Sequence, residues 1–331
     1  MYKILLTERI HSAGMKFLES NAEVIVADDT KIETLLAIIK GVDAIIIRST
    51  KMYNEVIDAS DKLHVIGRHG IGVDNIDVEY ATRKKIAVIN TPLANVNSVA
   101  EHVIALMMAL SKKLLIAGKA MREGKTSIEG KSLPGLCQSL GLGGFELTNK
   151  TLGIAGFGKI GSLTAQKCMK AFDMQVLVYD PPVYKEFELP EGARWVETLD
   201  ELLVNSDYVS LNVPLLPSTK NMIGEAQLRM MKPSAYLINC ARGGIIDENA
   251  LYRALKENCI AGAALDVFVQ EPPMKDLNLF ELDNLIVTPH AAAMTEESLH
   301  RMAMEVSQGV LKVLAGEMPY NLVNKVLKTA D

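Results

Sequence analysis

The sequence has few cysteines, and those present show no metal-binding or disulfide pattern. The four cysteines are Cys137, Cys168, Cys240 and Cys259, and none belongs to a CxxC pair or another metal-ligand spacing. In a chain of 331 residues, so few scattered cysteines do not suggest a disulfide framework. We therefore expect reduced, mostly buried thiols, a cytoplasmic location and no metal site.

The sequence also has no long hydrophobic run and no strong excess of one charge. Its longest apolar run, 103–110, is far shorter than a membrane span, and a polar stretch directly follows residues 1–6, so we expect neither a membrane anchor nor a signal peptide. Lysine and arginine total 35 against 40 aspartate and glutamate, a formal charge of −5. This mild acidity argues against a nucleic acid or an anionic membrane as the main partner.

Short β-branched runs alternate with amphipathic stretches, and the length favours two domains. Strands separated by helices predict parallel pairing with right-handed crossovers. In the first ninety residues a helix is expected at 32–39, among strands near 3–6, 23–26, 44–47, 65–66 and 87–89. The amino-terminal segment is therefore expected to form a small doubly wound domain.

The pattern changes after residue 90. Ser98 and Glu101 fit a capping box that opens a helix running to about Arg122. Because 103–110 is apolar on every face, we expect this helix to be buried all round, with the arm at 124–149 packed beside it against the partner of a homodimer. Burial against the chain's own domains is the alternative.

Strand–helix alternation restarts at Thr151, with six strands expected near 152–155, 175–179, 208–211, 235–239, 262–265 and 285–287. A long helix at 295–315 follows, and 321–323 could return to the first domain as an extended segment. We predict an α/β fold of two doubly wound parallel sheets. A Rossmann cofactor domain at 99–291 is inserted into a flavodoxin-like substrate domain, 1–98 and 292–331.

Gly156, Gly158 and Gly161 form a GxGxxG pattern between an apolar strand and a helix expected at 162–172. The first glycine permits a tight turn, the second lets backbone amides approach a pyrophosphate, and the third allows close helix–strand packing. The helix amino terminus then faces the anion. This spacing predicts a dinucleotide site.

Asp180 ends the next strand, where its carboxylate can accept hydrogen bonds from both ribose hydroxyls of the cofactor. The same carboxylate would repel a 2′-phosphate, which favours NAD. Lys185 is the nearest basic residue, so acceptance of NADP stays open.

Three polar residues follow three successive strands of the predicted second sheet. Arg242 precedes two glycines that can turn the chain sharply, and its guanidinium could hold a carboxylate in a bidentate fork. Glu271 and His290 follow the next two strands, where ligands of parallel sheets bind. The alternatives are a surface salt bridge for Arg242 and a buried structural histidine for His290.

The sequence resembles the D-isomer-specific 2-hydroxyacid dehydrogenases, the family of phosphoglycerate dehydrogenase and of glyoxylate and hydroxypyruvate reductases. The matching blocks run nearly end to end and are HGIGVDNID at 69–77, NTP at 90–92, GFGKIG at 156–161, VPLLPST at 213–219, NCARGGIIDE at 239–248, GAALDVF at 262–268, EPP at 271–273 and TPH at 288–290.

The resemblance implies reduction of a 2-oxo acid or oxidation of a 2-hydroxy acid with NAD. It implies that His290 is the acid/base, that Glu271 tunes it and that Arg242 holds the substrate. Backbone amides around Gly70, Ile71 and Gly72 would grip the substrate carboxylate. Asp266 would contact the nicotinamide carboxamide, and the other implied cofactor contacts are Lys159, Ile160, Pro214, Thr219, Cys240, Ala241 and His290.

Some features depart from the family or leave choices open. His69 stands where many members have a small residue, Asn212 where many have histidine, and the arm is longer than in relatives. The chain ends soon after the return helix, so we expect no regulatory carboxy-terminal domain. Arg48, Arg68 and His69 could bind a phosphate, which keeps phosphoglycerate dehydrogenase open beside a small unphosphorylated substrate. An NAD(H)-sensing binding protein on the same fold is the alternative of another class.

Overall fold

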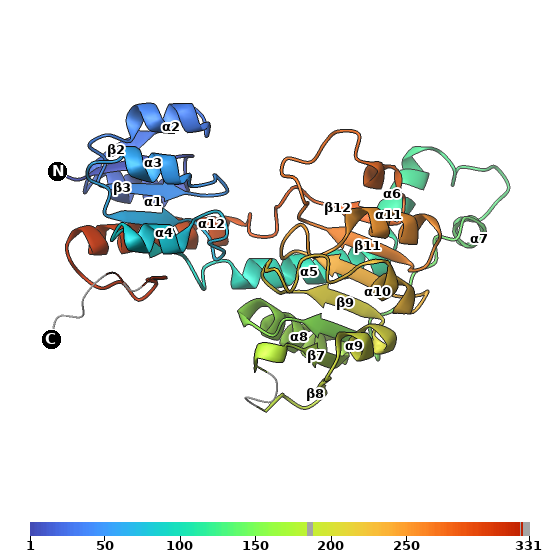
Figure 1. Cartoon of the computed structure of the whole chain (residues 1–331). Coiled ribbons are helices and arrows are strands. Elements are labelled where there is room, and N and C mark those ends of the chain that lie inside the picture. Colours follow the sequence, from blue (N-terminus) through green and yellow to red (C-terminus); the bar gives the residue numbers. More distant parts are fainter. Residues whose placement is uncertain (184–187, 325, 327–331) are drawn as a thin grey trace. The chain divides into compact units, whose positions relative to one another are not determined.

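The computed structural model describes residues 1–183, 188–324 and 326. Lys185, which bears on the choice between NAD and NADP, lies outside these residues. The chain divides into two compact units, the first of Met1–Ser98 with Ala293–Asp331 and the second of Val99–Ala292 (Figure 1). Along the chain, the second unit is inserted into the first.

The first unit is built on a five-stranded sheet with the order β2-β1-β3-β4-β5 and only parallel pairs. This is the strand order of flavodoxin-like folds. The strands are β1 (Lys3–Leu6), β2 (Glu23–Val26), β3 (Ala44–Ile47), β4 (Val65–Arg68) and β5 (Ala87–Ile89). The helices are α1 (Ser12–Glu19), α2 (Ile32–Ile38), α3 (Asn54–Ala59), α4 (Val78–Arg83) and α12 (Glu296–Leu314).

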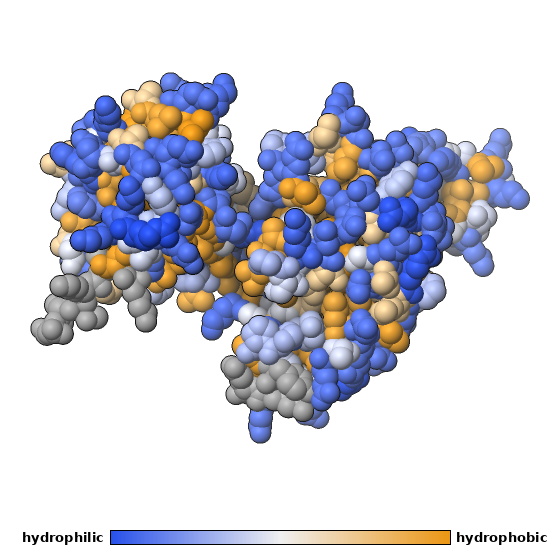
Figure 2. Space-filling view, viewed as in Figure 1, coloured by the Kyte–Doolittle hydropathy of each residue, from blue (hydrophilic) through white to orange (hydrophobic). Residues whose placement is uncertain are grey.

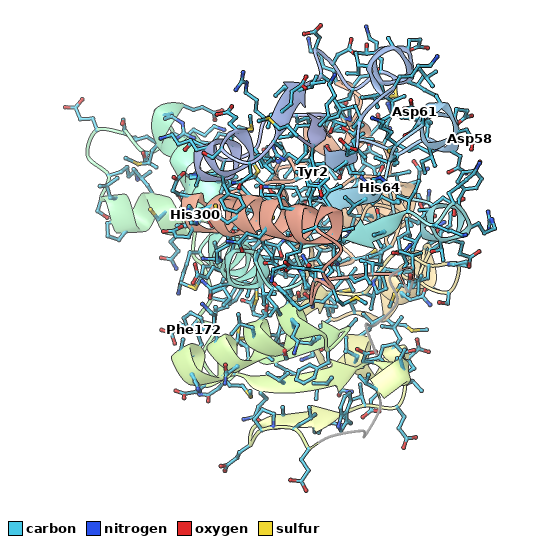
Figure 3. All side chains as sticks on the ribbon, turned by 90° about the vertical axis from the view of Figure 1, so that its left-hand side faces the viewer. Tyr2, Asp58, Asp61, His64, Phe172 and His300 are labelled. Atoms are coloured by element: carbon cyan, nitrogen blue, oxygen red, sulfur yellow. The ribbon has the colours of Figure 1, made fainter. Side chains whose placement is uncertain are left out.

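Both faces of this sheet are covered, which explains its unbroken apolar strands. Successive residues of β3 alternate between two cores: Ile46 packs on the side of α1 and α12, and Ile45 on the side of α2 to α4. Figure 3 looks onto α12, with His300 at the beginning of the helix. The hydroxyl of Tyr2 donates a hydrogen bond to the carbonyl of Leu314 at the other end (2.7 Å).

The segment after α12 returns to β5. Leu322 forms an antiparallel bridge with Ile89, and the amide of Val323 donates to the carbonyl of Val88 (2.7 Å). The side chain of Asn324 accepts from the Val88 amide at 2.8 Å. The predicted extended return is therefore confirmed.

The second unit contains a seven-stranded, all-parallel sheet with the order β12-β11-β10-β9-β6-β7-β8. This is the Rossmann order with one further strand at the end that carries β12. The strands are β6 (Thr151–Ala155), β7 (Gln175–Tyr179), β8 (Ala193–Trp195), β9 (Tyr208–Leu211), β10 (Tyr236–Asn239), β11 (Gly262–Leu265) and β12 (Leu285–Val287). The predicted fold class is confirmed. The predicted count of six strands is wrong, because β8 is short, only half-buried and has Arg194 at its centre.

The helices of this unit are α5 (Val96–Ser111), which begins just before the boundary, α6 (Leu114–Arg122), α7 (Leu133–Ser139), α8 (Lys159–Phe172), α9 (Leu199–Asn205), α10 (Glu225–Met230) and α11 (Glu248–Lys256). Short 3₁₀ helices cover Pro181–Val183 and Asn278–Glu281.

The predicted single helix from Ser98 to Arg122 is wrong in two respects. The helix already begins at Val96, so Ser98 lies inside it rather than at its cap, and it breaks where Lys113 adopts a left-handed backbone (φ 50°) between α5 and α6. Burial of the segment around Ser98 overrides the local capping signal.

Within this chain α5 is buried on one face rather than all round. Val103, Leu106, Met107 and Leu110 enter a core shared with β6 and α8, whereas Ala105 is exposed. The arm at 124–149 contains a helix that the sequence did not predict, α7, whose Ser132 cap accepts from the Gly135 amide. Figure 2 shows apolar side chains on the surface of this arm.

Candidate functional site

The glycine loop after β6 has the geometry of a phosphate-binding turn. Gly156 has a left-handed backbone (φ +93°), and a Cβ on Gly161 would lie 2.2 Å from the Gly156 carbonyl oxygen. A Cβ on Gly158 would meet nothing within 4 Å. Gly158 also caps α8, whose first amides have no partner inside the helix. Open space and helix amides therefore meet at one point, where an anion fits.

Asp180 follows β7 and is tied to this loop. Its Oδ2 accepts a hydrogen bond from the amide of Phe157 at 2.7 Å. The ring of Phe157 in turn packs edge-on against Trp195, with 5.9 Å between centroids. The carboxylate thus braces the glycine loop with Oδ2.

The other expected cofactor residues lie around the same sheet edge. At the start of α8, Lys159 is exposed and Ile160 half-buried. The hydroxyl of Thr219 donates to the carbonyl of Pro214 (2.6 Å), which closes the turn after β9. Cys240 and Ala241 directly follow β10.

The turn that carries Arg242 is held by Asn239, the last residue of β10. Its side chain accepts from the Ala241 amide (3.0 Å) and donates to the Arg242 carbonyl (2.8 Å). A Cβ on Gly243 would lie 1.8 Å from the carbonyl oxygen of Phe268, so only glycine fits there. The Arg242 guanidinium donates to the carbonyl of Ala241 (2.7 Å) at the carboxyl edge of the sheet.

Glu271 and His290 form the central pair of the site. His290 Nδ1 lies 2.7 Å from Glu271 Oε2, and the amide of Phe268 donates to Glu271 Oε1 (3.1 Å). Partial burial raises the pKa of Glu271, but His290, the Phe268 amide and the charge of Arg242 outweigh this effect and hold it below its usual value. The structure thus brings Glu271 and His290 into contact, and the Arg242 charge acts on the same carboxylate.

Asp266 is fully buried and organises the loop that carries His290. Its carboxylate accepts from the hydroxyl of Thr288 (2.5 Å) and from the amides of Ala291 (2.7 Å) and Ala292 (2.9 Å). Its carbonyl accepts from the His290 amide (2.8 Å). His290 has a left-handed backbone (φ 53°), a conformation that costs a non-glycine residue about 1–3 kcal/mol. These hydrogen bonds sustain that conformation.

Sequence reasoning missed two polar residues of this network. His102 on α5 places Nε2 at 3.1 Å from Thr288 Oγ1 and 3.6 Å from Asp266 Oδ1. Thr288 belongs to the TPH block, so that motif could have indicated it. His102 stands in an otherwise apolar helical run, and its partners depend on tertiary packing that no local pattern reports.

The glycines expected to bind the substrate carboxylate lie in the first unit, after β4. Gly70 has φ +147°, and its carbonyl accepts from the amide of Thr91 (2.9 Å). The carbonyl of Ile71 accepts from the side chain of Asn90 (2.7 Å), and Gly72 is half-buried.

Next to them, His69 is 3% exposed, and burial together with the charges of Arg48 and Arg68 lowers its pKa to about 3. A neutral His69 adds no charge to those of Arg48 and Arg68, so its surroundings do not support the predicted cationic role. Arg68 donates a hydrogen bond to the His69 carbonyl, and Arg48 Nη2 lies 3.2 Å from Met294 Sδ.

The described residues offer neither a metal-binding cluster nor a membrane-spanning helix. No group of three or more histidine, cysteine, aspartate or glutamate side chains there is arranged to hold a metal ion. No helix among these residues is both long and apolar enough to cross a membrane.

Comparison with known proteins assigns a family to more than half of the chain. Residues 104–292 match the model of the D-isomer specific 2-hydroxyacid dehydrogenase NAD binding domain. A D-3-phosphoglycerate dehydrogenase of Methanocaldococcus jannaschii is 44% identical over 325 residues, which are 98% of this chain and 60% of that protein. The glyoxylate reductase of Korarchaeum cryptofilum is 38% identical over 327 residues, 98% of this chain and 96% of that one.

Solved structures agree with these matches. The D-lactate dehydrogenase of Aquifex aeolicus, crystallised with NAD and lactic acid, is 29% identical with a TM-score of 0.83, and the match covers 99% of this chain and 100% of that one. The TT0316 protein of Thermus thermophilus is 30% identical with a TM-score of 0.87, covering 97% and 100%. The match covers between 50% and 60% of the length of the phosphoglycerate dehydrogenases compared.

Proposed function

The chain belongs to the D-isomer specific 2-hydroxyacid dehydrogenase family, and from this premise we propose that it interconverts a D-2-hydroxy acid and its 2-oxo acid with NAD. The observation that carries the proposal is the 2.7 Å contact between His290 and Glu271, at the strand ends of a sheet that also bears the glycine loop. Such a pair supplies acid/base chemistry beside a nucleotide site. A glutamine at 271 would have suggested a reaction without proton transfer.

The residues of the second unit fit the cofactor. The open space at Gly158 and the first amides of α8 would receive the pyrophosphate, and Asp180 the ribose hydroxyls. When bound, the nicotinamide ring donates or accepts the hydride. Asp266, with both oxygens already engaged, would hold the loop beside that ring and, as the resemblance implies, contact its carboxamide.

His290 is proposed to move the proton. Its Nδ1 faces the Glu271 carboxylate, so Nε2 is the nitrogen that would exchange a proton with the substrate oxygen. The ionised Glu271 stabilises the charged imidazole that delivers the proton during reduction. Glu271 would also fix the ring orientation.

Arg242 is proposed to hold the substrate carboxylate and to stabilise the negative charge that develops on the reacting oxygen. The amides of Gly70, Ile71 and Gly72 are proposed to bind the same carboxylate. Neither role needs a metal ion, because guanidinium and amide donors supply the positive potential.

The first test measures NADH oxidation with glyoxylate, pyruvate, hydroxypyruvate and 3-phosphohydroxypyruvate. We expect turnover with at least one of them, and we expect His290→Ala to reduce kcat by about 10² to 10⁴, the span of a general acid/base. NADH affinity should stay unchanged in the variant. Tight NADH binding without turnover of any 2-oxo acid would favour the sensing role. Near-normal turnover of His290→Ala would remove that residue from the mechanism.

We propose an unphosphorylated 2-oxo acid as substrate, because the neutral His69 leaves only two of the three suggested cations, Arg48 and Arg68, in the first unit. Phosphoglycerate dehydrogenase activity is the alternative, and relatives of both kinds match the chain. The deciding values are kcat/KM for 3-phosphohydroxypyruvate and for hydroxypyruvate in wild type and Arg68→Ala. A phosphate preference that collapses in the variant would overturn the proposal.

We further propose that the protein is a homodimer and that it is cytoplasmic. The location rests on its four free cysteines, the usual state in a reducing compartment. The dimer rests on the exposed apolar side chains of α6 and the arm, which are Leu114, Leu115, Met121, Ile128, Leu133, Leu140 and Phe145.

A further inference from the structure

A hydrogen-bonded network of three side chains connects helix α5 to the loop that carries His290. It begins at His102, passes through Thr288 and ends on the buried carboxylate of Asp266. All of these residues lie in the second unit, and none contacts Glu271 in the hydrogen bonds described above. This network is therefore a second support of His290, separate from the contact with Glu271.

The donors and acceptors in this network can be assigned. The Thr288 hydroxyl has one proton, and its 2.5 Å contact with the acceptor-only carboxylate of Asp266 commits that proton. The hydroxyl oxygen can then only accept from His102 Nε2 at 3.1 Å. His102 Nε2 therefore carries a proton and donates it to the hydroxyl oxygen of Thr288.

The same carboxylate fixes the backbone on both sides of the catalytic imidazole. Its oxygens accept from the amides of Ala291 and Ala292, while the backbone carbonyl of Asp266 accepts from the amide of His290. Because His290 sits in the left-handed region (φ 53°), its backbone depends on these bonds to stay there. Whatever orients Asp266 also orients His290.

We propose that His102 is a positioning residue, which holds the Asp266–Thr288 pair and through it the His290 loop in the geometry for proton transfer. This inference rests on the proposed function of His290. His102 does not touch the reacting atoms in this account. Its loss should lower kcat through misplacement of the imidazole, while the glycine loop and Asp180, the main contacts proposed for the cofactor, stay intact.

The test uses two matched pairs of variants in the full chain. His102→Leu removes the donor, and Thr288→Val removes the hydroxyl that links His102 to Asp266. His102→Gln and Thr288→Ser retain a polar group at each position. His64→Leu, which alters an exposed histidine of the first unit (Figure 3), is the control. NADH affinity is followed through the single tryptophan, Trp195, which packs on Phe157 of the glycine loop.

We expect kcat to fall about tenfold to a hundredfold in His102→Leu and Thr288→Val, with NADH affinity within about twofold of wild type. His102→Gln and Thr288→Ser should recover most of this loss, and His64→Leu should match wild type. If kcat is retained in His102→Leu, the proposal is wrong. A rise in KM for NADH at unchanged kcat would also overturn it, since it would assign His102 to cofactor binding.

An activity-independent measurement separates this proposal from the proposed function. The Cε1–H resonance of His290 in a ¹H–¹³C NMR spectrum should shift in His102→Leu and Thr288→Val and stay in place in Thr288→Ser and His64→Leu. Wild-type protein that turns over no 2-oxo acid but shows these shifts would refute the dehydrogenase assignment alone. A His290 resonance unmoved in every variant would refute the positioning role alone.

Discussion

At the scale of single residues, the site depends on where charges are held. The Glu271 side chain is 34% exposed, and its pKa lies below the usual value because His290, the Phe268 amide and Arg242 stabilise the ionised form more than partial burial opposes it. The carboxylate therefore stays charged throughout the neutral range. This charge, 2.7 Å from His290 Nδ1, supports the proposed role of His290 in proton transfer.

Replacing Glu271 by glutamine should change the pH dependence of both stability and rate. A carboxylate with a lowered folded pKa stabilises the native state above its unfolded pKa, and this contribution is lost as the pH falls through the lower folded value. The difference in Tm between wild type and Glu271→Gln should therefore be constant near neutrality and shrink under acidic conditions.

The rate of 2-oxo acid reduction should shift to lower pH in the same variant, because the imidazole loses its anionic partner. Steady-state pH profiles and calorimetric scans provide both measurements. An unchanged rate profile would show that Glu271 only braces the Phe268 loop through the 3.1 Å hydrogen bond.

Asp180 has two separable functions that substitution can distinguish. Asp180→Ala should weaken NAD binding about tenfold to a hundredfold, since it removes a charged acceptor, and should narrow the gap to NADP. Asp180→Asn keeps an acceptor for the Phe157 amide, which now lies 2.7 Å from Asp180 Oδ2, but removes the charge. Titration of both cofactors should show improved NADP binding in both variants. If NADP affinity rises in neither, the carboxylate does not select against the phosphate.

At the scale of elements, two glycines at the start of α8 allow effects on stability and effects on cofactor binding to be measured separately. A methyl group on Gly161 would collide with the Gly156 carbonyl, whereas one on Gly158 would enter open space. Gly161→Ala should lower the free energy of unfolding by about 1–3 kcal/mol, the cost of overpacking. Gly158→Ala should leave Tm nearly unchanged and weaken NADH binding. Equal NADH affinity in Gly158→Ala and wild type would show that no phosphate approaches this position.

The sequence allowed most elements to be predicted, and the exceptions have physical causes. Buried parallel strands such as Ala44–Ile47 are continuous apolar runs, and each predicted strand is present. Strand β8 lies at the sheet edge, is three residues long and lacks such a run. The break at Lys113 and the cap of α7 at Ser132 depend on local backbone geometry that no periodicity reports.

The site shows the same division. The position of Arg242, Glu271 and His290 at one edge of the sheet could be predicted, because the carboxyl ends of parallel strands meet at that edge. The hydrogen bonds that set the geometry of these side chains could not be predicted from the sequence. Asp266 was expected to contact the cofactor, yet its carboxylate also holds Thr288, Ala291 and Ala292, partners chosen by the folded loop.

At the scale of the whole molecule, α6 and the arm present apolar side chains that a single chain leaves uncovered. Leu115 is 52% exposed and Leu133 54% exposed, and Figure 2 shows apolar surface on the arm. Exposed apolar side chains on neighbouring elements are the observation on which the proposed dimer rests.

We expect sedimentation at micromolar concentration to show a species of twice the chain mass of 36.2 kDa. A double variant, Leu115→Glu with Leu133→Glu, places two charges in the proposed interface and should shift the protein toward monomer. Val204→Glu on α9, where the side chain is 50% exposed, is the matched control and should leave the dimer intact. A wild-type protein that sediments as a monomer would refute the dimer. If the double variant and Val204→Glu dissociate equally, added charge alone explains the effect, and the interface does not involve α6 and the arm.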